Sequence, residues 1–164
     1  MVPAPGSTPR PTLGAITSSD RDQISALLCL YAERIDAGDF EGLADLLGHA
    51  ELTAEGSDHV TRGADAVRAL YDATTLRYED GTPRTKHLTT NVIVEIDDGG
   101  ASASARSYFT VLQAVPGRLA LQPVVAGRYR DRFERAEDGW RFSGRHIVVD
   151  LVGDVSQHLR IEIP

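Results

Sequence analysis

Among the residues whose types allow proton transfer, we take His87, Asp36 and Tyr31 as the candidates. Imidazole titrates near neutral pH, so a neutral histidine can take a proton from carbon beside a carbonyl group while a carboxylate holds its tautomer. Each also has a plain structural interpretation, as a surface histidine, a solvated aspartate and a core tyrosine with its hydroxyl at the edge. On an ideal helix Tyr31 and Asp36 project about 140° apart, so helical geometry alone does not pair them.

Motifs for metal, nucleotide and nucleophilic chemistry are absent from the sequence. There is no GxGxxG, Walker, HExxH or GxSxG pattern, and the single cysteine, Cys29, excludes CxxC sites and intrachain disulfides. The histidines lack close metal-ligand spacing; they are His49, His59, His87, His146 and His158. We therefore expect no metal and no cofactor, and the cysteine content predicts a reducing, cytoplasmic compartment.

Length and charge limit the classes of partner. The 164 residues, 41% of them hydrophobic, suit one domain. Lys and Arg number 17 against 24 Asp and Glu, a net charge of −7, so neither nucleic acid nor an anionic membrane surface is an expected partner. No apolar run approaches the roughly 20 residues of a membrane helix. We expect residues 1–18, which are rich in proline, to be a disordered leader and residues 19–164 to form the single domain.

The elements that must position these residues divide the chain in two. Apolar spacing and capping residues predict helices at 20–37, 40–47 and 63–73, with one short strand within 50–60. The second half contains β-rich runs separated by short turns, which indicate antiparallel hairpins. These runs cover 87–96, 101–113, 119–135 and 140–151. Helices followed by such a meander predict an α+β fold with a curved sheet against the helices.

Strand 87–96 has one apolar face. Alternation places Leu88, Thr90, Val92, Val94 and Ile96 on one side of the strand and His87 on the other. His87 points into a pocket if its own, mixed face lines a cavity, and to the surface if the apolar face meets the helices. Because that apolar face exceeds what three short helices can cover, we expect a homodimer or homotrimer.

Four segments together resemble the SnoaL-like proteins of the nuclear transport factor 2 superfamily. They are YAERIDAGDF at 31–40, KHLTTNVIVE at 86–95, GRYRDRF at 127–133 and DGWRFSGR at 138–145. Their order and spacing carry the resemblance, which covers about residues 20–150. It implies a cone-shaped, curved antiparallel sheet wrapped around three helices, with an apolar pocket at the open end.

The resemblance also implies a site. In scytalone dehydratase, bile acid 7α-dehydratase and lindane dehydrochlorinase, an aspartate at the end of the first helix pairs with a histidine that begins the long strand. Those positions match Asp36 and His87, and Tyr31 matches a pocket tyrosine of the two dehydratases. Arg145 matches a pocket arginine of some relatives, and is otherwise a surface strand residue.

The chain departs from that pattern in two segments. Where scytalone dehydratase has a second histidine, residues 101–113 offer Arg106 and Tyr108, and we take Tyr108 as a candidate substrate contact. The segment after the second helix lacks the dehydratases' tyrosine. It places Ala54 nearest to the general base of the steroid isomerases, which argues against that activity. His146 could supply a missing polar group, but of the adjacent residues Arg145 and His146 only one can point inward.

The leading expectation is a cofactor-free lyase that eliminates water from a small hydrophobic, polycyclic or polyketide-like substrate. His87 would be the base, Asp36 its orienting partner and Tyr31 the hydrogen-bond donor. The alternatives are a biosynthetic cyclase or isomerase that uses the same proton abstraction, and a non-catalytic binder or dioxygenase small-subunit-like protein.

Overall fold

The computed structural model describes residues 19–161 and contains three helices, as predicted. Helix α1 spans Asp20–Ala37 and begins with a capping box, in which Ser19 and Asp22 bind each other's backbone amides. It ends at Gly38, whose φ of 71° suits glycine. Helices α2 and α3 span Phe40–Leu47 and Ala64–Thr74. The predicted leader, residues 1–18, lies outside the described residues.

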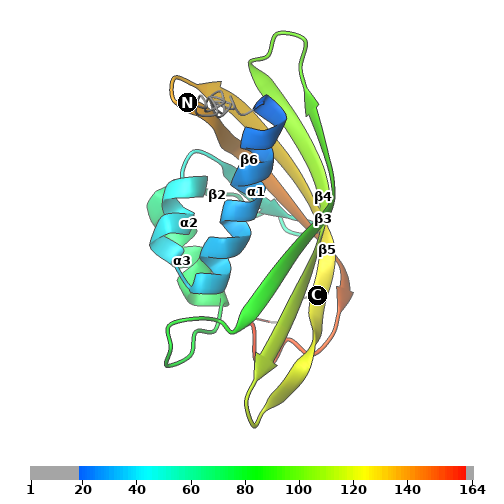
Figure 1. Cartoon of the computed structure of the whole chain (residues 1–164). Coiled ribbons are helices and arrows are strands. Elements are labelled where there is room, and N and C mark those ends of the chain that lie inside the picture. Colours follow the sequence, from blue (N-terminus) through cyan, green and yellow to red (C-terminus); the bar gives the residue numbers. More distant parts are fainter. Residues whose placement is uncertain (1–18, 162–164) are drawn as a thin grey trace, which may run out of the picture.

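Six strands form one curved sheet in the order β2-β1-β6-β5-β4-β3, and the helices lie on its concave side (Figure 1). The strands are β1 Glu51–Ala54, β2 Thr61–Arg62, β3 Thr85–Ile96, β4 Ser102–Val115, β5 Leu119–Ala136 and β6 Gly139–Val152. The expected α+β fold is confirmed, with one correction: β1 pairs with β6 in parallel, so the sheet is mixed. No hairpin links these two strands, which are far apart in sequence, and their direction is therefore not restricted to antiparallel.

The expected single apolar face of β3 is wrong. The pairing of β3 with β4 shifts between Thr90 and Ile93, and Asn91 adopts a left-handed φ of 53°. This bulge reverses the alternation. Before it His87 faces inward and Leu88 outward; after it Val94, on the predicted face of Leu88, is buried in the core instead.

The core fills the space between the helices and the concave side. Its fully buried members include Ile24, Leu28, Leu43, Phe133 and Phe142. These come from α1, α2, β5 and β6, so the apolar stripe of the helices packs directly on the two long central strands.

The homo-oligomer stays a prediction, and its basis changes because Val94 is not available at the surface. Within residues 19–161 the exposed large apolar side chains are Leu88, Val92, Ile93, Tyr108, Leu121, Leu151, Val152 and Ile161. None of the described helices is long and apolar enough to cross a membrane.

Candidate functional site

Asp36 and His87 meet at the inner side of the sheet. The Nδ1 atom of His87 lies 2.6 Å from Oδ1 of Asp36, and the backbone amide of His87 donates to Oδ2 at 2.8 Å. Both side chains are enclosed, with 5% of His87 and 7% of Asp36 exposed. Both side chains are therefore shielded from most of the solvent.

The end of α1 and the beginning of β3 create this contact. Thr85 and His87 both point inward, and the Thr85 hydroxyl donates to Oδ1 of Asp36 at 2.7 Å. Burial raises the pKa of Asp36, but the hydrogen bonds from His87 and Thr85 outweigh it, and that pKa lies below its ordinary value. Asp36 is therefore a carboxylate near neutral pH.

The carboxylate determines how His87 is protonated. In neutral His87, Nδ1 carries the hydrogen because Asp36 can only accept, and Nε2 then keeps its lone pair. Nε2 makes no hydrogen bond within residues 19–161. This nitrogen is the one available to take a proton from a ligand.

Tyr31 lies next to His87 although the two come from different elements. Their ring centroids are 6.3 Å apart in an edge-on arrangement, and Tyr31 also contacts Tyr129 at 5.8 Å. The Tyr71 hydroxyl donates to the Tyr31 hydroxyl at 3.2 Å, and Tyr129 is a further hydrogen-bond partner of Tyr31. Burial raises the pKa of Tyr71 and of Tyr129 well above 10, so both stay neutral.

Arg145 points inward and is 1% exposed, so of the two adjacent candidates it is the inner one. Its guanidinium binds Asp131 through two hydrogen bonds of 2.7 and 2.9 Å. It also stacks over Tyr31, 4.0 Å from the ring centroid, and over Tyr129, at 4.2 Å. Burial disfavours the cation, but Asp131 outweighs it and raises the pKa of Arg145. The inner side therefore holds a guanidinium that stays protonated and is paired with Asp131 beside Tyr31.

Four buried side-chain atoms in the described part of the chain have no hydrogen-bond partner. They are Nη1 of Arg145, Oγ of Ser107, Oε1 of Gln113 and Nδ1 of His158. All four residues are among the buried polar residues of the protein. Unpaired buried polar atoms are costly and uncommon in folded proteins, and they are expected where a ligand supplies the missing partner.

The sequence analysis did not select His158. Its ring lies 6.3 Å from that of His87. It belongs to residues 153–161, a segment after β6 for which neither apolar periodicity nor a motif gave a signal. Sequence reasoning could have found it only as the last of five histidines.

The other two sequence candidates lie on the outer side of the sheet. Tyr108 is 52% exposed and points away from the helices, so it lies on the other side of the sheet from the Asp36 and His87 contact, and its contact with a substrate stays a prediction. Alternation along β4 explains this, because the neighbouring Ser107 and Phe109 point inward. His146 binds Thr53 through Nδ1 at 2.8 Å and Glu55 through Nε2 at 3.0 Å.

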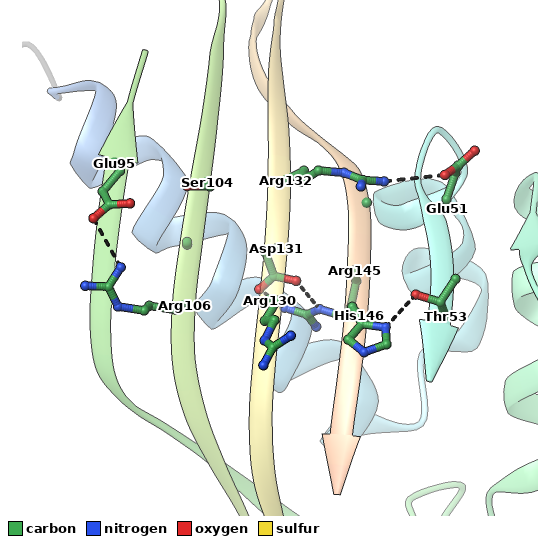
Figure 2. Close-up of a pocket in the computed structure, with 12 residues that line it drawn as sticks. Glu51, Thr53, Glu95, Ser104, Arg106, Arg130, Asp131, Arg132, Arg145 and His146 are labelled. Atoms are coloured by element: carbon green, nitrogen blue, oxygen red, sulfur yellow. Dashed lines mark hydrogen bonds and ion pairs between the residues drawn. The ribbon is translucent and has the colours of Figure 1, made fainter. Parts of the chain in front are cut away.

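A hollow of about 400 Å³ lies beside His146 on that outer side (Figure 2). Its exposed charged side chains are mostly paired, Arg106 with Glu95 and Arg132 with Glu51, and the buried pair of Asp131 and Arg145 also lines it. The view shows the Arg145 and Asp131 pair behind the strands, on the inner side. The outer hollow is therefore separated by the sheet from the Asp36 and His87 contact.

A comparison with protein families matches residues 17–146 to the SnoaL-like domain. The chain belongs to the SnoaL-like family. The match includes every element from α1 to the middle of β6, and with them Tyr31, Asp36, His87 and Arg145. It ends before the segment that carries His158. No curated protein matches the chain by sequence.

Solved structures share this SnoaL-like fold. An NTF2-like protein with a cystatin-like fold from Novosphingobium aromaticivorans is 25% identical, with a TM-score of 0.66 over 84% of this chain and 86% of the other. A Mycobacterium tuberculosis protein of unknown function is 26% identical, with a TM-score of 0.64 over 87% and 81%. A candidate scytalone dehydratase from N. aromaticivorans is 19% identical, with a TM-score of 0.63 over 80% and 84%, which shows the fold alone.

Proposed function

We propose that this protein is a cofactor-free lyase that removes water from a small, hydrophobic, polycyclic hydroxycarbonyl compound. The observation that carries the proposal is the buried contact of 2.6 Å between His87 Nδ1 and the Asp36 carboxylate, which leaves Nε2 as a base. The SnoaL-like family and the fold shared with a candidate scytalone dehydratase support the same class of chemistry.

The reaction begins with proton abstraction. Nε2 of His87 takes a hydrogen from the carbon next to the substrate carbonyl, and Asp36 stabilises the imidazolium that forms. The electron pair of the broken C–H bond forms the C=C bond as the C–O bond to the β-hydroxyl breaks. The imidazolium returns the proton to the departing oxygen, which leaves as water, and His87 is neutral again.

Arg145 and Tyr31 are suited to the charge that develops on the carbonyl oxygen. Nη1 of Arg145 is buried and unpaired, and the Tyr31 hydroxyl, which accepts from Tyr71, has a hydrogen of its own to donate. Donors that are already in place, in a site closed to water, stabilise an oxyanion with little reorganisation. Asp131 holds Arg145 and so acts as a positioning residue.

The test separates proton abstraction from elimination. With 1-tetralone in heavy water, the wild-type protein is expected to exchange the hydrogens next to the carbonyl, and with 3-hydroxy-1-tetralone it is expected to form 1-naphthol. His87→Gln and Asp36→Asn should each lower both rates by roughly 10²- to 10⁴-fold. The double variant should be scarcely slower than either single variant, because the two residues act as a unit.

His146→Gln is the matched control, since it makes the same change in the histidine on the outer side and should leave both rates unchanged. Exchange of 1-tetralone without formation of naphthol would favour the cyclase or isomerase alternative, in which the enolate has another fate. Absence of exchange in the wild type would favour a binder and would overturn the proposal.

A further inference from the structure

The chain segment 153–161 crosses the inner side next to His87. The Tyr78 hydroxyl donates to the Gln157 carbonyl at 2.7 Å, and the Leu76 amide donates to the His158 carbonyl at 2.9 Å. The Arg160 amide donates to the Thr74 carbonyl, at the end of α3, at 2.8 Å. The segment is thus tied to the residues that follow α3, and these contacts place His158 against the site with only 4% of the residue exposed.

Two of the unpaired buried atoms belong to this region: Nδ1 of His158 and Oε1 of Gln113. The orientation of the Gln113 amide is set by its nitrogen, which donates to the carbonyls of Gln157 at 2.6 Å and Pro83 at 3.0 Å. Its oxygen is therefore the atom left over, and it can only accept. Gln113 pairs across β3 with Thr85, the residue that binds Asp36.

The protonation state of His158 limits which chemical group of a ligand it can bind. Burial lowers the pKa of His158 from 6.5 to about 4; a proton on His87 would lower this pKa further by repulsion, and the Asp36 carboxylate opposes the lowering. The imidazole is neutral near pH 7, so it offers one donor and one acceptor. A hydroxyl group is chemically complementary to these two atoms, because it can accept from an imidazole N–H and donate to an amide oxygen such as Oε1 of Gln113.

We infer that His158 contacts the substrate and that, together with Gln113, it binds the hydroxyl group eliminated beside His87. The inference rests on the proposed function and adds to it the group that holds the leaving oxygen. His87 takes the proton from carbon and returns it to this oxygen, while the neutral His158 donates a hydrogen bond to it and is unchanged at the end.

The experiment measures binding, so that it does not depend on turnover. The probes are 2,2-difluoro-3-hydroxy-1-tetralone, which has no hydrogen next to the carbonyl and so cannot undergo the proposed elimination, and 2,2-difluoro-1-tetralone, which lacks the hydroxyl. His158→Phe removes the polar atoms at similar volume. His158→Asn keeps a polar atom near the position of Nδ1.

For the hydroxylated probe, we expect His158→Phe to raise the Kd roughly tenfold, as for loss of one buried hydrogen bond, and His158→Asn to recover most of it. For the probe without the hydroxyl, all three proteins should bind equally. Gln113→Leu should reproduce the same selective loss. Exchange of 1-tetralone hydrogens should persist in His158→Phe, because the base remains.

If His158→Phe raises the Kd of both probes equally, the segment has a merely structural role and the inference is overturned. So would an unchanged Kd for the hydroxylated probe, or failure of the wild type to bind it. Absence of 1-tetralone exchange in the wild type overturns the lyase proposal instead, and a selective loss of the hydroxylated probe in His158→Phe would still establish the hydroxyl subsite.

Discussion

Both sides of the sheet carry arginine and histidine, but these residues are buried on the inner side and exposed or partly exposed on the outer side. On the inner side Arg145 is buried, bound by Asp131 and stacked between aromatic rings, whereas Arg130 on the outer side is exposed. His87 has a buried carboxylate as its partner, and His146 shares an exposed edge with Glu55. Residue type alone therefore says little about chemistry here.

Solvent explains the difference. A charge pair in water gains little, because water screens it and the side chains lose freedom when they are held together. The same pair out of water is strongly coupled, and every polar atom left unpaired there costs free energy. The inner side thus combines strong interactions with unsatisfied groups, and both are what a binding or catalytic site requires. None of the buried unpaired atoms found in residues 19–161 belongs to the outer candidates Tyr108 and His146.

The largest contrast is expected between two arginine variants. Arg145→Met leaves Asp131 buried without its partner and should lower the free energy of unfolding by about 3–5 kcal/mol, whereas Arg130→Met should change it by less than about 0.5 kcal/mol. Urea unfolding measures both. Arg145→Met combined with Asp131→Leu should regain most of the loss, since no charge is then stranded. Equal effects of the two single variants would contradict the contrast.

The next contrast is in the pH dependence of stability. Between pH 6.5 and about 4 the unfolded chain protonates His158 while the folded chain, with His87 and Asp36 facing it, does not. Because the unfolded state binds more protons, stability falls as the pH is lowered through this interval, by about 3 kcal/mol from this residue. Between pH 6.5 and 4, the free energy of unfolding measured in urea should fall by about 3 kcal/mol less in His158→Phe than in the wild type. An unchanged pH dependence in this variant would show that other groups cause the fall.

The smallest contrast concerns two serines of β4. Ser107 is buried with an unpaired hydroxyl, and Ser104 is exposed on the outer side. Without ligand, Ser107→Ala should stabilise the protein by about 1 kcal/mol, because an unsatisfied group is removed. Ser104→Ala should change stability by less than about 0.5 kcal/mol, as is usual for surface positions. Thermal unfolding measures both, and destabilisation by Ser107→Ala would mean that its hydroxyl has a partner.

Local sequence patterns predicted the helices and strands well, because helix caps and turns depend on neighbouring residues. The capping residues Ser19 and Gly38 bound α1 where the sequence placed it, and the turns rich in Asp, Gly and Pro separate the long strands as expected. The parallel pairing of β1 with β6 was not predictable, since it depends on how segments about 90 residues apart meet.

The site was predictable in part, and what could not be predicted again depends on contacts between segments far apart in the sequence. The family resemblance named Asp36, His87, Tyr31 and Arg145, and the structure places these four on the inner side, while their roles in catalysis stay predictions. The choice between Arg145 and His146 needed the orientation of β6, which no local pattern gave. His158 was missed because its place depends on hydrogen bonds from residues before β3 to the end of the chain.

The bulge at Asn91 has a consequence for how sequences of this kind can diverge. It divides β3 into a half that presents Thr85 and His87 and a half that presents Val94, both toward the interior. Deletion of one residue between 90 and 93 would restore plain alternation and turn one half outward, so that either the histidine or the core valine is lost. We therefore expect insertions and deletions in this strand to be excluded far more strictly than substitutions, although Asn91 and Val92 at the bulge are themselves exposed.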